Sequence, residues 1–300
     1  MLRAARAAAA LLLLAAPARA ELYPAAELAQ ARQAYADNIR YQLREDMGVP
    51  AHAVALHLPD RGPNPLSVWA EPASASVNLP IATVRFIDDL GILWTHLDRH
   101  GCERTYLLTY LHALLREGRA LPGPLAAFGI ARETALADPF VNDVSGKIVT
   151  TAIYFLLAHE VAHLALGHAA RGPGAASIAQ EVEADAVALA AFREKGLPPI
   201  GVSFYFLAAR WLDPARADAL GSTHPLSADR IAALAEAMLN DPAAYSHAEP
   251  DPQAGAARVT SMATDLLRVA RRAAEDGVIA ALPAGLAEAW PLDRLAQACD

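Results

Sequence analysis

Three histidines and a glutamate lie within eleven residues of a stretch that is otherwise rich in alanine and leucine, AHEVAHLALGH, residues 158–168. His159 and His163 are four residues apart, so on a helix they lie one turn apart on one face and can reach the same metal ion. Glu160 is rotated by about 100° from His159, where it can meet a water at the metal but is badly placed as a ligand. The spacing predicts two metal ligands, His159 and His163, and a general base, Glu160.

A metal site of this kind needs a third ligand. His168 follows His159 by nine residues, about half a turn around a helix, so it should face away and cap the carbonyl end of its helix instead. The segment QEVEADAVALAAF, residues 180–192, is a better source. Its steps of three and four place Glu181 and Asp185 on an apolar stripe, where unpaired charges would be expensive.

We therefore predict Glu181 as the third metal ligand, with Glu183, which should face solvent, as the alternative. Asp185 is one turn beyond Glu181 and can accept the outer N–H of a ligand histidine. The competing interpretation of these acids is a helix that pairs with arginines at a protein interface. Two histidines and a glutamate would leave one position of a tetrahedral zinc ion to water, which is the open arrangement of catalytic sites.

One Zn²⁺ per chain would lower the pKa of that water, and Glu160 would accept its proton before attack on a carbonyl carbon, the chemistry of peptide-bond hydrolysis. The negatively charged intermediate also needs a hydrogen-bond donor. The segment GSTHPLSADRI, residues 221–231, offers His224 in a loop and Arg230 at the start of the next helix.

Three elements in this order, HEVAH at 159–163, EVEAD at 181–185 and THPLSADRI at 223–231, resemble the M48 family of zinc metallopeptidases, within the gluzincins. The resemblance covers about residues 145–235 and implies the zinc ligands, the general base and the outer partner named above. It also implies that His224 and Arg230 lie near the substrate and its oxyanion. The gap of seventeen residues after His163 is similar to that of ImmA/IrrE-like gluzincins.

The elements that must position these residues indicate an α+β fold, mostly helical, and the resemblance implies a zincin-like metallopeptidase core. Short β-prone runs between residues 51 and 87 predict a small sheet, which could supply an edge strand for an extended substrate. Asp88 and Asp89 are interpreted as a helix start. Asn142, Asp143 or Ser145 is expected to cap the helix that carries the histidines. Helical periodicity predicts helices over 24–47, 88–118, 146–170, 177–195, 202–212 and 226–239.

The first twenty residues, MLRAARAAAALLLLAAPARA, combine arginines, a short apolar run and a small-x-small end, which predicts a signal peptide at 1–20. A metallopeptidase domain is expected over 21–241, with the zinc-site helices at 146–195. The stretch 242–256, rich in Pro, Asp and Gly, predicts a linker before a helical C-terminal segment, 257–300. We expect an exported protein, most simply periplasmic and otherwise secreted, with no stable membrane span after signal cleavage.

Loss of the signal segment moves the formal net charge from −8 to −11, and no basic stripe suggests a nucleic-acid partner. Cys102 and Cys299 can form a disulfide in an oxidising compartment, although the sequence leaves this open. His96 and His100 share the four-residue spacing but lack a third ligand. The leading hypothesis is an exported zinc endopeptidase acting on protein or peptide segments. The alternatives are a catalytically silent zinc-containing peptide-binding or scaffold protein of the cell envelope, and a helical interaction protein without metal.

Overall fold

The computed structural model describes residues 21–44, 53–168, 175–212, 226–276, 295–296 and 298–299. In this part of the chain the fold is α+β and mostly helical with a small sheet, as predicted. The segment predicted as a signal peptide lies outside the described residues. The described elements before the central helix are α1 (Ala25–Arg44), β1 (Ala55–His57), β2 (Trp69–Glu71), β3 (Ser76–Asn78), α2 (Ile81–Arg99), α3 (Thr105–Leu111), α4 (Pro124–Ala127) and α5 (Arg132–Leu136).

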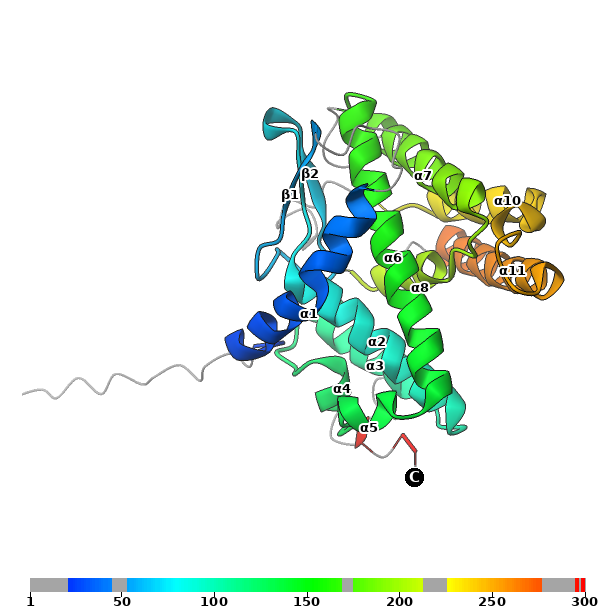
Figure 1. Cartoon of the computed structure of the whole chain (residues 1–300). Coiled ribbons are helices and arrows are strands. Elements are labelled where there is room, and N and C mark those ends of the chain that lie inside the picture. Colours follow the sequence, from blue (N-terminus) through cyan, green and yellow to red (C-terminus); the bar gives the residue numbers. More distant parts are fainter. Residues whose placement is uncertain are drawn as a thin grey trace, which may run out of the picture.

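The central helix is α6 (Pro139–Ala165), which runs through the middle of the molecule in Figure 1. It packs against α2, against α7 (Ala175–Lys195) and against α8 (Ile200–Ala209). Its second half is almost continuously buried, from Ala152 to His163. A helix that is apolar on all sides is stable only inside a core, so its few polar side chains are held in a protein interior.

The ends of α6 differ from the prediction of a helix over 146–170. The helix begins seven residues earlier, because Asp138 accepts hydrogen bonds from the backbone N–H groups of Phe140 and Val141 and Pro139 fits the first helical position. The predicted caps were therefore wrong. The helix ends at Ala165, where Gly167 adopts a φ of 67° that reverses the chain.

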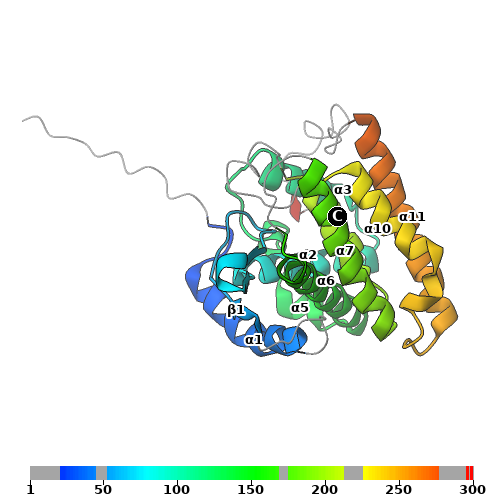
Figure 2. The same ribbon diagram turned by 90° about the horizontal axis from the view of Figure 1, so that it is seen from above.

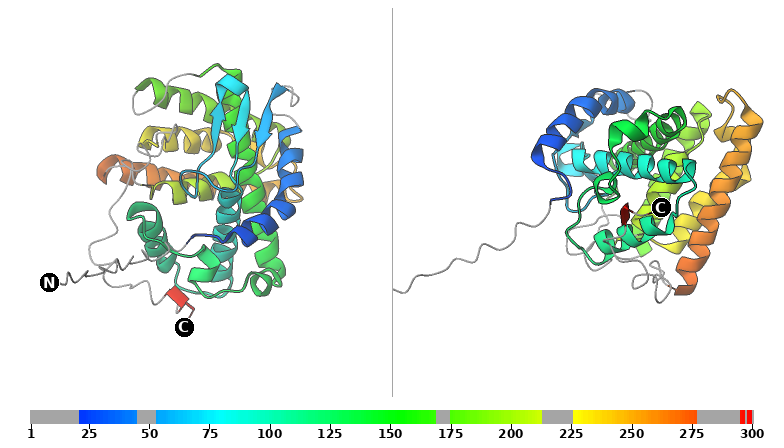
Figure 3. Two further views of the ribbon diagram at one scale, coloured as in Figure 1. Left: turned by 90° about the vertical axis from the view of Figure 1, so that its left-hand side faces the viewer. Right: turned by 90° about the horizontal axis from the view of Figure 1, so that it is seen from below.

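The small sheet lies beside the C-terminal half of α6, as Figures 1 and 3 show. Its strand order is β1-β3-β2, with β1 parallel and β2 antiparallel to β3. In the described part of the sheet β2 is an edge strand, and it contacts α6. The β-prone region ends at Asn78, not at residue 87, because Pro80 precedes the first turn of α2 and the apolar side chains that follow are buried with helical spacing.

The helix predicted over 88–118 is two elements: α2, which ends at Arg99, and α3, which continues into a π-helical turn over His112–Arg116. Between them Gly101 adopts a φ of 66°. Asp88 and Asp89 therefore lie in the middle of α2, and the prediction that they start a helix was wrong. Both are buried.

Two arginines and two tyrosines surround this aspartate pair. Arg132 of α5 pairs with both carboxylates, and Arg85 lies 3.0 Å from Asp89. The hydroxyl of Tyr23 donates to Asp89 at 3.0 Å, and that of Tyr35 in α1 donates to Asp88. The cluster joins α1 and α5 to α2.

The C-terminal layer consists of α10 (Ala228–Asn240) and α11 (Pro252–Asp276), which pack side by side (Figure 2). The stretch predicted as a linker, 242–256, contains regular structure. It contains a 3₁₀ turn over Pro242–Tyr245, with Tyr245 buried, and α11 begins within it. The prolines and aspartates of this stretch mark two helix starts.

The chain end returns to the body of the protein through a Cys102–Cys299 disulfide, which the sequence had left open. The backbone N–H of Glu103 donates to the carbonyl of Ala298 at 2.9 Å beside it. By length and composition α6 could also cross a membrane, but most of it is buried inside the fold, as in the core helix of a soluble protein. The expected absence of a membrane span stays a prediction.

Candidate metal centre

The side chains of His159, His163 and Glu181 converge between α6 and α7. The two imidazole Nε2 atoms are 3.0 Å apart. One carboxylate oxygen of Glu181 lies 3.3 Å from Nε2 of His159 and the other lies 3.2 Å from Nε2 of His163. All three residues are buried and form a group that could hold a metal ion. Donor atoms around one tetrahedral zinc at 2.0–2.1 Å are about 3.3 Å apart, so the arrangement fits that ion.

The charged side chains around the histidines also suit a divalent cation at this position. Glu160, Glu181 and Asp185 are each at most 3% exposed, and the guanidinium of Arg230 is buried among them. Among the described residues this region thus holds three buried carboxylates and one buried arginine, which contacts Glu181 and Asp185. When both imidazoles are neutral, as metal ligation requires, these groups carry a net charge of −2, which is expensive in a protein interior and which a divalent cation would balance.

Asp185 contacts the outer nitrogen of the candidate ligand His159. Its Oδ1 is 2.8 Å from Nδ1 of His159. Burial raises the pKa of the Asp185 carboxyl, but Arg230 and His159 lower it by more, so the net shift is downward and the group is a carboxylate. Burial lowers the pKa of His159, and Asp185 and Glu181 together reverse that shift.

Arg230 comes from the first turn of α10, where the Ser227 hydroxyl accepts the Arg230 backbone N–H. Its guanidinium donates to both oxygens of Asp185, at 2.6 and 2.9 Å, and lies 2.7 Å from Glu181. The competing interpretation from the sequence was that these acids pair with arginines at a protein interface. They do pair with an arginine, but it belongs to the same chain. Arg230 therefore contacts two carboxylates of the cluster, and whether it lies near a substrate stays a prediction. His224 lies outside the described residues.

His168 contacts the cluster, which the sequence argument had rejected. Its Nδ1 is 2.9 Å from Nδ1 of His163, and its Nε2 is 3.1 Å from Glu183. The rejection assumed that α6 continued to residue 170, whereas the helix ends at Ala165 and the chain turns back at Gly167. Glu183, the alternative ligand, contacts His168, and its side chain is 67% exposed.

Residues 119–248 match the family model described as Peptidase U49. The match indicates a peptidase family. It contains each sequence-predicted site residue of the HEVAH, EVEAD and THPLSADRI elements, and it is not specific for M48 or for ImmA/IrrE-like gluzincins. No curated protein and no solved structure gives a significant match to the chain.

Tyr205 of α8 is a further polar group near the cluster, and sequence reasoning missed it. Burial raises the pKa of its phenol; Arg230 lowers it, and the carboxylates of Glu160 and Glu181 raise it further, so the hydroxyl lies within their electric field. The hydroxyl donates to the carbonyl of Leu66, just before β2, at 3.3 Å. In the sequence it is one aromatic residue of an apolar run, so only tertiary packing reveals its position.

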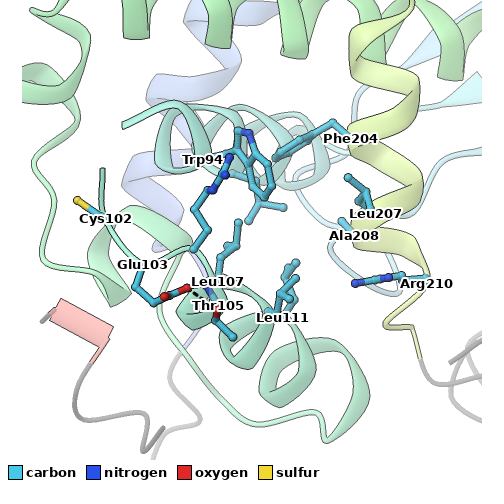
Figure 4. A pocket seen from close by; sticks show the side chains of 13 residues that line it. Trp94, Cys102, Glu103, Thr105, Leu107, Leu111, Phe204, Leu207, Ala208 and Arg210 are labelled. Atoms are coloured by element: carbon cyan, nitrogen blue, oxygen red, sulfur yellow. Dashed lines mark hydrogen bonds between the residues drawn. The ribbon is translucent and has the colours of Figure 1, made fainter. Parts of the chain in front are cut away.

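A separate cavity of about 540 Å³ lies between α2, α3 and α8. Figure 4 shows Trp94 and Phe204 on one side of it and Arg210 on another, with Cys102 near its margin. None of the predicted site residues lines it. The cavity and the histidine cluster are therefore different features of the molecule.

Proposed function

We propose that this protein is an exported, zinc-dependent endopeptidase with Glu160 as its general base. The observation that carries the proposal is the convergence of His159, His163 and Glu181 at the spacing of zinc ligands, inside the region that matches a peptidase family. Three protein ligands rather than four are typical of a catalytic zinc site, since one position remains for water.

The reaction would divide between the metal and Glu160. When bound, zinc supplies Lewis acidity, which polarises the scissile carbonyl and lowers the pKa of a water molecule. Glu160 follows His159 directly on a rigid, buried helix, so its carboxylate is held beside the cluster without being one of the ligands. Its role would be to accept the proton of the attacking water and transfer it to the leaving amine.

The edge strand β2 supports an extended polypeptide as the substrate. It lies at the edge of the sheet next to α6, and an extended segment can pair with such an edge through main-chain hydrogen bonds. The hydroxyl of Tyr205 ties the chain just before this strand to the neighbourhood of the cluster. This geometry favours unfolded or extended protein segments over folded ones.

Export is supported by two independent features. The first twenty residues have the composition of a signal peptide. The Cys102–Cys299 disulfide is typical of proteins in oxidising compartments, such as the periplasm or the extracellular space.

Reconstitution with metal tests the proposal. Residues 21–300 would be stripped with a chelator and titrated with Zn²⁺ while cleavage of an unfolded protein is followed. We expect cleavage to appear with the metal and to reach a plateau at one ion per chain. Cleavage by the stripped protein would contradict the role of zinc. One tightly bound ion without any cleavage would favour the silent peptide-binding or scaffold protein.

A further inference from the structure

The two candidate ligand histidines have different outer partners. The outer nitrogen of His159 faces Asp185, a buried carboxylate that Arg230 holds in place with two hydrogen bonds. The outer nitrogen of His163 faces a second imidazole, that of His168, at 2.9 Å. The carboxylate of Glu183 contacts the other ring nitrogen of His168.

His163, His168 and Glu183 form a row of contacting side chains. Metal ligation determines which ring nitrogen in this row carries each proton. A histidine that binds a metal through Nε2 in its neutral form carries its proton on Nδ1. His163 would then donate from Nδ1 to Nδ1 of His168, which must be unprotonated to accept. The proton of a neutral His168 is consequently on Nε2, where Glu183 can accept it at 3.1 Å. Each of the two contacts then has one donor and one acceptor.

We infer that His168 and Glu183 are positioning residues for the metal ligand His163. His168 fixes the tautomer and ring orientation of His163, and Glu183 orients His168 in turn. The inference rests on the proposed metal centre and extends it to two residues outside the ligand set. The side chain of His168 is only 6% exposed, so its ring is held by packing as well as by these contacts.

The two positioning residues should differ in strength. Outer partners of ligand histidines typically contribute about 10- to 100-fold in metal affinity. His168 contacts the ligand directly, so its removal should have an effect in that range. Glu183 acts through His168 and is largely exposed to solvent, which screens its charge, so its removal should cost only a few-fold.

The experiment measures the zinc dissociation constant by competition with a chelating dye, and the visible spectrum of the cobalt-substituted protein. The variants are His168→Ala, His168→Asn and Glu183→Gln. Asn retains an oxygen acceptor near the position of Nδ1 but cannot reach Glu183. The matched control is Glu194→Gln, an exposed glutamate on the same helix. Unfolding of each metal-free variant separates an effect on the ligand from a general loss of stability.

We expect His168→Ala to weaken zinc binding about 10- to 100-fold and to alter the cobalt spectrum. His168→Asn should recover most of the affinity, Glu183→Gln should lose a few-fold, and Glu194→Gln should match the parent. Unchanged affinity and spectrum in His168→Ala would overturn the inference, as would a loss of metal-free stability that accounts for the whole effect. His159→Ala tests the metal centre separately: if it bound zinc as tightly as the parent, the centre itself would be refuted and the inference with it.

Discussion

Two regions of this protein bury acidic side chains beside arginine, and they differ in charge balance. In the cluster on α2, Asp88 and Asp89 face Arg85 and Arg132, so acids and bases are equal in number. Around the histidines of α6, the described residues include three buried carboxylates and one buried arginine, which contacts two of them. The charges of the first cluster balance within the chain, whereas the second, with neutral histidines, has a surplus of negative charge that a divalent cation would balance.

The comparison shows how a structural ion cluster differs from a candidate metal site when both are buried. In the aspartate cluster the opposite charges are equal in number, and tyrosine hydroxyls donate to the carboxylates. These contacts hold helices together. A surplus of carboxylate beside two imidazole nitrogens creates a position where a divalent ion is stabilised. Five substitutions, from the largest expected effect to the smallest, test these assignments.

Replacement of the candidate ligand in Glu181→Ala should give the largest change. One of three protein ligands is lost, so zinc affinity should fall by about 1000-fold or more, as expected for a metal bound with about 10–16 kcal/mol. Cleavage should disappear with it. Dye competition measures the affinity, and Glu194→Gln on the same helix is the control. Affinity within tenfold of the parent would exclude Glu181 from the ligand set.

Arg132→Met should destabilise the fold without affecting the metal. It leaves two buried aspartates without their shared arginine, and breaking a buried ion pair costs about 3–5 kcal/mol. Urea unfolding of the metal-free protein would measure this loss, and zinc titration should give the parent affinity. A change in zinc affinity would mean that the aspartate cluster influences the metal site and is not purely structural.

Neutralising one acid in each cluster should give effects of opposite sign in the metal-free protein. Asp89→Asn removes a charge that Arg85 and Arg132 require, so the free energy of unfolding should fall by about 1–3 kcal/mol. Glu181→Gln reduces the surplus of negative charge, and Asp185 keeps its two hydrogen bonds to Arg230. The free energy of unfolding should therefore rise by about 1 kcal/mol. Denaturant unfolding after chelation measures both. A loss of stability in both variants would show that the charge surplus is not the distinguishing feature.

Tyr205→Phe should have the smallest effect. The substitution removes the hydrogen bond to the carbonyl before β2, whose net value of about 1 kcal/mol corresponds to a factor of about five. Because this contact positions the edge strand and not the ligands, KM for an unfolded substrate should rise about fivefold with zinc affinity unchanged. Steady-state kinetics at several substrate concentrations provide the measurement. A large fall in kcat at constant KM would instead assign Tyr205 to the reacting atoms.

The sequence was most informative where the geometry is local. His159 and His163 share one helix face, so their spacing alone predicted that they converge, and the apolar stripe of the next helix identified Glu181 and Asp185. The mostly helical fold and the small sheet also followed from periodicity. These features depend on steps of two to four residues, which the pattern of side chains records directly.

The features that sequence reasoning missed depend on where helices end and on what packs across them. His168 reaches the candidate ligand His163 only because α6 stops at Ala165. Asp88 and Asp89 were misinterpreted as a helix start because the β-branched residues before them favour a strand. Those residues belong to α2, where burial with helical spacing outweighs their strand propensity. The partners of Arg230 lie about fifty residues away in sequence, and no local pattern predicts such a contact.

The most direct test of the account compares Glu160→Gln with the parent protein, both loaded with equal amounts of zinc, in cleavage of an unfolded protein. Gln keeps the size of Glu160 but cannot accept the proton, and loss of a general base typically costs about 10²- to 10⁴-fold in rate. We expect the variant to retain one zinc ion and to lose cleavage by at least that factor. Cleavage at the parental rate by the zinc-loaded variant would contradict it.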